Sequence, residues 1–316
     1  MARCEAESMA AFESNCPRDR LLSWLPGFND GPDPHRESQR QYHESTEVDT
    51  VPPHVIPRTP MKSIAPAPQP SRVEIASADC MDYLRSLDSD SVDLVATDPA
   101  YSGMNQHLRL GRGRIVGHYS KPNNDDWFQE FADDPDQFSA FLKECQRVLR
   151  DGRHIYIMFD TFSLLSLGAI VREHFGVKGV IVWDKMSMGM GNYFRRQHEF
   201  ILFAAKGRRS INRRDITDVW TIRRLHKKTY PTQKPVALFQ KMLDASAEPG
   251  YVVCDPFVGS GSSAIAAMTR QCDFRGCDAS PTAARNARER VAAYLSTGLD
   301  PCESQNAKVI ALRAEG

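Results

Sequence analysis

The residues Asp98-Pro99-Ala100-Tyr101 place a carboxylate, a rigid turn and an aromatic ring in succession. Residues 91–97 before them alternate into a short apolar strand, and Pro99 must end it because proline fixes its own φ and lacks an N–H donor. An acceptor, a free carbonyl and a flat ring then meet at the carboxyl edge of a sheet, where open α/β sheets bind ligands. An extruded nucleobase with an exocyclic amine needs this set of groups. A β-turn in which Tyr101 only packs is an equally good interpretation of these four residues.

A second motif lies late in the chain, where a predicted strand over residues 251–254 leads into Asp255-Pro256-Phe257-Val258-Gly259-Ser260-Gly261-Ser262. The glycines let a ligand approach the backbone, and the turn opens onto the amino terminus of a helix. Asp278 ends the next predicted strand, at the position from which an acid accepts hydrogen bonds from ribose hydroxyls. The pattern predicts a nucleoside-containing ligand, with a tight turn that binds nothing as the alternative.

Two cofactors fit this glycine loop by spacing alone. A nicotinamide dinucleotide is one of them, and the protein would then be an oxidoreductase. Asp255 is an awkward neighbour for a pyrophosphate, however, and suits the cationic amino-acid end of S-adenosyl-L-methionine. The charge at this position therefore favours S-adenosyl-L-methionine.

Basic residues form a third signal. Between Arg195 and Lys234 there are twelve Lys or Arg residues against three acids, and the loop 107–121 adds more. We expect both stretches to flank the active edge and to contact phosphates, although a solvated surface is the plainer interpretation of a charge run. The candidate DNA-binding residues are Arg109, Arg112, Arg114, Arg195, Arg196, Arg208, Arg213, Arg223, Arg224 and Lys227.

Alternating strands and helices must position these motifs. Apolar patterns predict strands at 73–76, 92–97, 154–159, 177–183, 199–205, 251–254 and 273–277, and helices at 138–149, 161–175, 236–247, 262–270 and 282–295. Such alternation with short links predicts an α/β fold, a doubly wound and mostly parallel Rossmann-like sheet covered on both faces. Two polar stretches, 102–127 and 206–231, interrupt it.

Composition narrows the class of protein further. The net charge of the 316 residues is zero, so a polyanion must be met by local patches. The eight cysteines are scattered without a Cys-x-x-Cys pair, which indicates reduced thiols in a cytoplasmic protein and no metal site. No apolar run is long enough to span a membrane. Residues 1–70 hold 11 of the 20 prolines, and we expect them to be a disordered extension with at most a short helix near 19–25.

Five motifs occur in a fixed order: Asp79-Cys80, Asp98-Pro99-Ala100-Tyr101, His198–Phe203, Pro231–Pro235 and Asp255–Gly261. Over residues 72–296 this order resembles the beta class of DNA amino-methyltransferases, in which the catalytic motif precedes the cofactor motif by circular permutation. The similarity is greatest to orphan or prophage-borne adenine-specific members, although restriction–modification enzymes belong to the same class. Ala100 stands where the family more often has a second proline.

The resemblance implies a role for each matching residue. Asp98 and the Pro99 carbonyl accept hydrogen bonds from the target amine, and Tyr101 stacks on the base. The residues implied to bind the methyl donor are Asp79, Cys80, Thr232, Lys234, Asp255, Phe257, Gly259, Ser260, Gly261, Ser262 and Asp278. Of these, Asp278 would hold the ribose, Asp79-Cys80 would border the adenine, and Thr232 and Lys234 would lie at the carboxylate end.

The implied function is methylation of adenine N6 in a short specific sequence of double-stranded DNA, by a bacterial or phage enzyme that could be a homodimer. Asp at the first position of the catalytic motif favours adenine. Cytosine N4 and RNA remain as rival substrates, and a non-catalytic DNA-binding regulator that keeps the donor site is an alternative of another class. The implied domain, residues 71–297, has a catalytic half (71–205), a basic target-recognition loop (206–231) and a cofactor half (232–297), followed by a tail (298–316).

Overall fold

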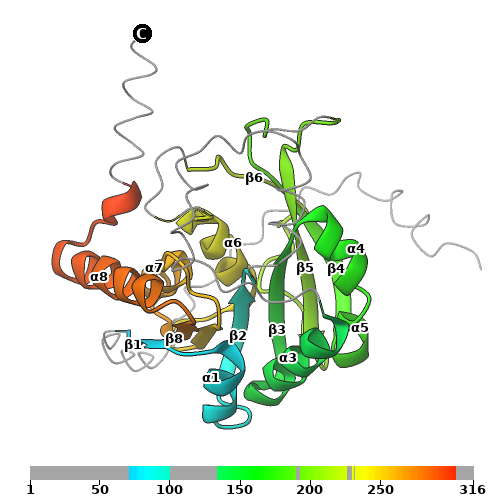
Figure 1. Ribbon diagram of the computed structural model, residues 1–316, viewed down its shortest axis with the longest axis horizontal. Helices are drawn as coiled ribbons and strands as arrows, with labels where there is room; N and C mark the ends of the chain where they lie inside the picture. The colour runs from blue at the N-terminus through cyan, green and yellow to red at the C-terminus, as the bar shows by residue number, and fades with distance from the viewer. Residues whose placement is uncertain (1–70, 100–133, 190–192, 226–229, 231, 304–316) are drawn as a thin grey trace, which may run out of the picture. The chain divides into compact units, whose positions relative to one another are not determined.

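The computed structural model describes residues 71–99, 134–189, 193–225, 230 and 232–303, all within one compact unit (Figure 1). The proline-rich extension and its short helix lie outside the described residues. So do Tyr101, Arg109, Arg112, Arg114 and Lys227, and the predictions made for them remain predictions.

The described chain forms an eight-stranded sheet in the order β1-β8-β7-β2-β3-β5-β4-β6. All neighbouring strands run parallel except that β5 is antiparallel to both β3 and β4. The strands are β1 (Val73–Ser77), β2 (Val92–Thr97), β3 (Leu149–Phe159), β4 (Gly176–Asp184), β5 (His198–Lys206), β6 (Val219–Thr221), β7 (Val252–Asp255) and β8 (Asp273–Asp278).

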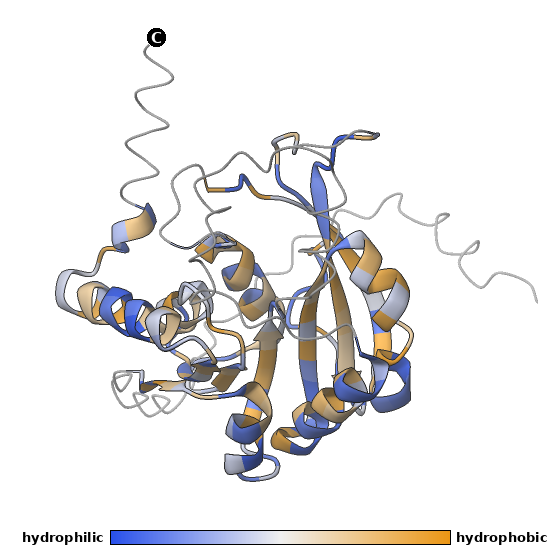
Figure 2. Cartoon of the chain, in the orientation of Figure 1, coloured by the Kyte–Doolittle hydropathy of each residue, from blue (hydrophilic) through white to orange (hydrophobic). Residues whose placement is uncertain are grey.

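Helices cover both faces of this sheet. One face packs against α1 (Cys80–Ser86), α3 (Pro135–Val148), α4 (Thr161–Leu167) and α5 (Val171–His174), and the other against α6 (Val236–Ser246), α7 (Ser262–Thr269) and α8 (Pro281–Thr297). Side chains along a strand point alternately to the two faces of the sheet, so each central strand contributes to two hydrophobic cores. In β3, Ile155 and Ile157 lie in one core, and Tyr156 and Met158 lie in the other. β2 is buried on both sides and hydrophobic along most of its length (Figure 2), as expected of a central parallel strand. The predicted doubly wound α/β fold is confirmed.

The direction of the strands gathers acidic residues at one edge. Because β2, β3, β4, β7 and β8 run in the same direction, Asp98, Asp160, Asp184, Asp255 and Asp278 all lie at their carboxyl ends. β5 runs the opposite way and therefore begins at this edge, at His198.

The structure differs from the sequence predictions in several local features. The seven-residue helix α1 and the three-residue strand β6 are too short to give a periodic signal, and both were missed. The predicted helix over 161–175 is divided into α4 and α5. β3 begins five residues earlier than predicted, directly after α3.

Candidate active site

Asp98 directly follows β2, and its side chain forms an ion pair with Lys234, which lies 136 positions later in the chain. The Lys234 ammonium also lies 3.6 Å from Glu199 Oε2, and Lys185 Nζ lies 3.2 Å from the other oxygen of Glu199. Asp98, Lys234, Glu199 and Lys185 thus form a row of alternating charges along the carboxyl edge. Neither Glu199 nor Lys185 was among the predicted site residues.

Charges within this row control one another's protonation. Burial disfavours the charged amine of Lys234, but the carboxylates of Asp98 and Glu199 outweigh it and raise the lysine pKa, so Lys234 is a cation. Burial raises the pKa of the Asp98 carboxyl, and the Lys234 ammonium acts against that rise by favouring the anion. Lys234 therefore favours the ionised form of Asp98, which is the stronger acceptor of hydrogen bonds.

The glycine loop between β7 and α7 lies beside this row. Gly259 and Gly261 both have positive φ, 50° and 81°, and Gly261 caps the amino end of α7. A Cβ at Gly259 would lie 3.2 Å from the Tyr230 ring, so this position needs glycine for conformation and for space. Asp278 at the end of β8 accepts hydrogen bonds from Gly259 N (2.8 Å) and Ser280 N (2.9 Å).

Lys234 also joins the two predicted halves of the site. Its carbonyl accepts a hydrogen bond from Ser262 Oγ at 2.7 Å, while its side chain contacts Asp98. The ring of Tyr230, four residues earlier, packs on Gly259. Burial raises the pKa of its phenol, and the charges of Asp278 and Asp98 raise it further. The carboxylate predicted to be catalytic and the loop predicted to bind the donor therefore open on the same edge.

Asp255 holds a different place from the one expected. It is 1% exposed, and its carboxylate accepts hydrogen bonds from Thr97 Oγ1 (2.9 Å), Ser263 Oγ (2.6 Å) and Phe257 N (3.0 Å). Burial raises its pKa to about 6 despite these bonds. Asp255 connects β2 to the start of α7 inside the fold, and the prediction that it faces the ammonium group of a ligand is not supported.

Other predicted donor-binding residues have contacts that stabilise the fold. Asp79 caps α1, accepting from Met81 N at 2.8 Å, and Cys80 is buried in the core. Phe257 is half-buried and packs edge-on against Phe141, with the ring centroids 5.6 Å apart. Thr232 is half-buried two residues before Lys234.

A buried ion pair that the sequence analysis missed supports the glycine loop. Arg290 of α8 binds Asp300 through two hydrogen bonds of 2.9 and 2.6 Å. The same guanidinium donates to the Ser260 carbonyl at 2.9 Å and to Ser262 Oγ at 3.0 Å. Arg290 follows Ala283 and Ala287 on the buried stripe of α8, and an arginine within an apolar stripe was the signal that could have identified it.

The predicted basic belt is split between the two edges of the sheet. Arg195 and Arg196 precede β5 and Arg223 and Arg224 follow β6, so these four lie at the carboxyl edge with Asp98. Because β5 is antiparallel, it ends at the opposite edge, and the chain that carries Arg208 and Arg213 continues from there: Asn212 N donates to Ala245 O at the end of α6. The expectation that the whole belt flanks the active edge is wrong for Arg208 and Arg213.

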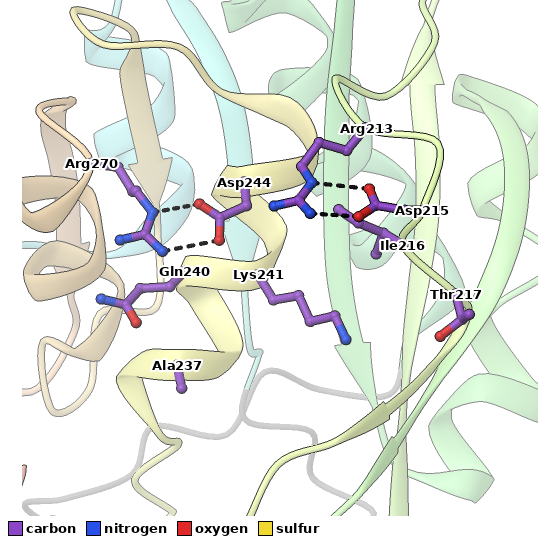
Figure 3. Close-up of a pocket in the computed structure, with 9 residues that line it drawn as sticks. All are labelled: Arg213, Asp215, Ile216, Thr217, Ala237, Gln240, Lys241, Asp244 and Arg270. Carbon is purple, nitrogen blue, oxygen red and sulfur yellow. Dashed lines mark hydrogen bonds and ion pairs between the residues drawn. The ribbon is translucent and has the colours of Figure 1, made fainter.

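A pocket of about 390 Å³ beside α6 contains one of these displaced arginines (Figure 3). Arg213 pairs there with Asp215, and Arg270 pairs with Asp244 of α6 through bonds of 2.5 and 2.9 Å. The lining includes neither Asp98 nor any residue of the glycine loop. This pocket is therefore separate from the candidate site.

The described residues contain neither a candidate membrane span nor a candidate metal site. No helix in this part of the chain is both long and apolar enough for a membrane span. His, Cys, Asp and Glu side chains do not gather in groups of three or more that could hold a metal ion, again within the described residues. Cys80, Cys145, Cys254, Cys272 and Cys277 are buried thiols without disulfides, as predicted.

The sequence of the chain is similar to those of known DNA methyltransferases. A family model described as DNA methylase matches residues 92–289. The type II methyltransferase M.HinfI of Haemophilus influenzae is 26% identical over 65% of this chain and 64% of its own, and M2.DpnII of Streptococcus pneumoniae is 25% identical over 72% of this chain and 92% of its own.

Solved structures share the fold. The M1.HpyAVI–SAM complex superposes with a TM-score of 0.51 at 20% identity, covering 69% of this chain and 99% of that one. The cytosine-N4-specific PvuII DNA methyltransferase superposes with a TM-score of 0.55 at 14% identity, covering 69% and 86%.

The fold is that of the S-adenosylmethionine-dependent methyltransferases, and Asp98 and the glycine loop lie together at one edge of its sheet. The chain belongs to the DNA methylase family, and the resemblance seen in its motifs is confirmed.

Proposed function

We propose that this DNA methyltransferase methylates N6 of an adenine that has been extruded from duplex DNA. The observation that carries the proposal is the Asp98–Lys234 pair, which holds a carboxyl acceptor at the same edge as the glycine loop. Two relatives, M.HinfI and M2.DpnII, are named type II methyltransferases, which supports a specific DNA sequence as the substrate.

The residues at the edge act mainly by positioning. The lone pair of an exocyclic amine is delocalised into the purine ring, which makes the nitrogen a poor nucleophile. Asp98 and the Pro99 carbonyl would each accept one hydrogen bond from the amine, favouring a tetrahedral nitrogen whose lone pair is free. Bound S-adenosylmethionine supplies an activated methyl group on a sulfonium. Correct placement of two reactants can contribute roughly 7–11 kcal/mol to lowering a barrier.

The loop and its neighbours fit such a donor. Gly259 and Gly261 adopt a positive φ that favours glycine, and because they carry no side chains a ligand can approach the backbone of the turn. Asp278 uses its oxygens on two backbone N–H groups, and a carboxylate has further lone pairs with which to accept from ribose hydroxyls. Ser260, Ser262 and Lys234 would line the amino-acid end. Phe257 and Thr232 would border the pocket, whereas Asp79, Cys80 and Asp255 would support it from within the fold.

Cytosine N4 is the second candidate target, because the PvuII enzyme that shares the fold is named cytosine-N4-specific. Single-molecule sequencing of DNA from cells that express the protein tests both, since it reports the modified base and its sequence context together. We expect N6-methyladenine at one short sequence. Modification of cytosine alone would replace adenine as the target, and DNA without any modification would contradict the proposal.

The Asp98→Asn variant tests the role of the carboxylate. It keeps the shape of the side chain and removes the charge, so methylation should fall at least about a hundredfold, as when one preorganised hydrogen-bonding group is lost from an active site. Calorimetry should show nearly unchanged binding of S-adenosylmethionine, because Asp98 faces the target. Retained turnover would refute the role of Asp98.

The arginines at the carboxyl edge, Arg195, Arg196, Arg223 and Arg224, are proposed to contact DNA phosphates. Each phosphate contact contributes about −0.9 to the slope of log affinity against log salt for duplex DNA. Replacing Arg223 by alanine should make the slope less negative by about 0.9, whereas Arg208→Ala, at the other edge of the sheet, should leave it unchanged. Equal slopes for both variants would remove Arg223 from the interface.

A further inference from the structure

The connection between β4 and β5 exposes apolar side chains. Tyr193 and Phe194 are 95% and 97% exposed, and Met186 and Met188 in the same connection are also exposed. Arg195 and Arg196 follow the two rings directly. Single exposed apolar residues are common on proteins, but several in one segment mark a binding surface.

This connection extends from the edge that holds Asp98. β4 ends and β5 begins there, and Phe200 of β5 lies opposite Phe159, the last residue of β3. Glu199, five residues after Phe194, is 3.6 Å from the ammonium that contacts Asp98. The exposed rings are thus carried by the segment that leads directly into the active site.

The base of the connection is held as a hairpin. Lys185 N donates to Gln197 O at 2.9 Å, and Gly189 N donates to Arg196 O at 2.8 Å. Arg195 Nε donates to Gly189 O at 2.9 Å, and the Arg196 guanidinium lies 4.9 Å from the centre of the Phe162 ring in α4. These contacts use both arginines to fix the hairpin, while the two aromatic rings stay in solvent.

We propose that Tyr193 and Phe194 form a wedge that enters the DNA stack beside the target base. The inference rests on the proposed function, because only an enzyme that extrudes a base leaves a gap to be filled. Apolar side chains that enter between base steps hold DNA in distorted states, and an aromatic ring stacks on any base. Arg195 and Arg196 place positive charge beside the rings, where the phosphates of the entered duplex would lie.

DNA fits this surface better than a second copy of the chain. In a twofold dimer the same patch meets itself, which would bring the arginines of both copies together around the aromatic rings. Phosphates instead complement these charges, and both rings can stack on bases without side-chain specificity. The wedge would stabilise the extruded state without reading sequence.

The test compares two duplexes that contain the target sequence found by sequencing. In one duplex the target base is paired. In the other it lies opposite an abasic site, so its extrusion breaks no base pair and costs less free energy. Phe194→Ala and Tyr193→Ala should lower kcat/KM on the paired duplex by about tenfold to a hundredfold, the range that removal of one base-stacking ring produces. The loss should largely disappear on the duplex with the abasic site. Leu295→Ala, an exposed apolar residue of α8, should match the wild type on both.

Two measurements separate the possible outcomes. The fluorescence of 2-aminopurine at the target position should rise on binding of the wild type and rise less with Phe194→Ala. An equal loss of kcat/KM on both duplexes, or no loss on the paired one, would overturn the wedge while the methyltransferase function stands. A wild type that methylates neither duplex would overturn the proposed function itself. Sedimentation that shows the variants dissociating from a dimer would make this surface an interface between copies and refute the proposal.

Discussion

Lys234 contacts Asp98 with its side chain and Ser262 with its backbone carbonyl, so one residue connects the carboxylate proposed to be catalytic to the glycine loop. An ammonium that is buried between two carboxylates holds its proton firmly, and it favours a negative charge on Asp98 next to the proposed donor site.

Replacing Lys234 by methionine should move the pH dependence of catalysis. The ammonium acts against the burial that raises the pKa of Asp98, so its removal should raise that pKa further. Because the ionised carboxylate of Asp98 is a stronger hydrogen-bond acceptor than the protonated carboxyl, the acidic limb of kcat/KM should shift to higher pH. The kcat at neutral pH should fall about a hundredfold, as when a reactant group is misplaced by about 1 Å. Lys185→Met, which removes a charge that contacts only Glu199 in this row, should shift the limb less. Superimposable pH profiles for Lys234→Met and the wild type would contradict the role of the pair.

Asp255 should make stability depend on pH in an unusual direction. Its pKa in the folded protein is raised from 3.8 to about 6, so the folded state holds a proton that the unfolded chain releases. This group's contribution to stability is complete below the unfolded pKa and is lost as the pH rises through about 6. Between pH 4.5 and 7.5 the wild type should lose about 2 kcal/mol of unfolding free energy relative to Asp255→Asn. Urea unfolding of both proteins at the two pH values measures the difference, and a constant difference would show that Asp255 is ionised throughout.

Removing Asp300 should destabilise the fold and the donor site together. Asp300→Ala leaves the buried Arg290 guanidinium without its carboxylate, a change that typically costs about 3–5 kcal/mol. Because Arg290 also holds Ser260 and Ser262, binding of S-adenosylmethionine should weaken as well. Asp215→Ala, which breaks an exposed pair with Arg213, is the control and should leave both unchanged. Thermal unfolding measures the loss of stability, and calorimetry measures the binding of S-adenosylmethionine. Equal Tm values for the two variants would contradict the prediction.

Glycine at 259 should be required for binding as well as for folding. Gly259→Ala strains a positive φ and brings a Cβ to 3.2 Å from the Tyr230 ring, whereas Gly250→Ala strains a positive φ of 85° with no atom within 4 Å. Both should lose about 1–2 kcal/mol of stability from the left-handed conformation. Only Gly259→Ala should also weaken the binding of S-adenosylmethionine in calorimetry. If Gly250→Ala weakened binding equally, the effect would come from general destabilisation.

The sequence by itself determined the two main motifs and the fold class of this protein. Pro99 after the apolar run of β2 and the two glycines before α7 made the catalytic and donor motifs visible, because a turn, a strand end and a glycine loop are properties of a few consecutive residues. The alternation of strands and helices determined the fold class, since a strand buried on both faces must be hydrophobic along its length.

Only the tertiary structure decided which residues share the active edge. The antiparallel direction of β5 brings Glu199 to Lys234 and carries Arg208 and Arg213 to the opposite edge. The Lys234–Asp98 and Arg290–Asp300 pairs likewise depend on elements that pack together at a distance along the chain. An apolar strand has the same sequence pattern in a parallel and in an antiparallel pairing, so the direction of β5 could not be predicted from its sequence. An ion pair between residues far apart in the chain produces no local sequence pattern, so these pairs could not be predicted either.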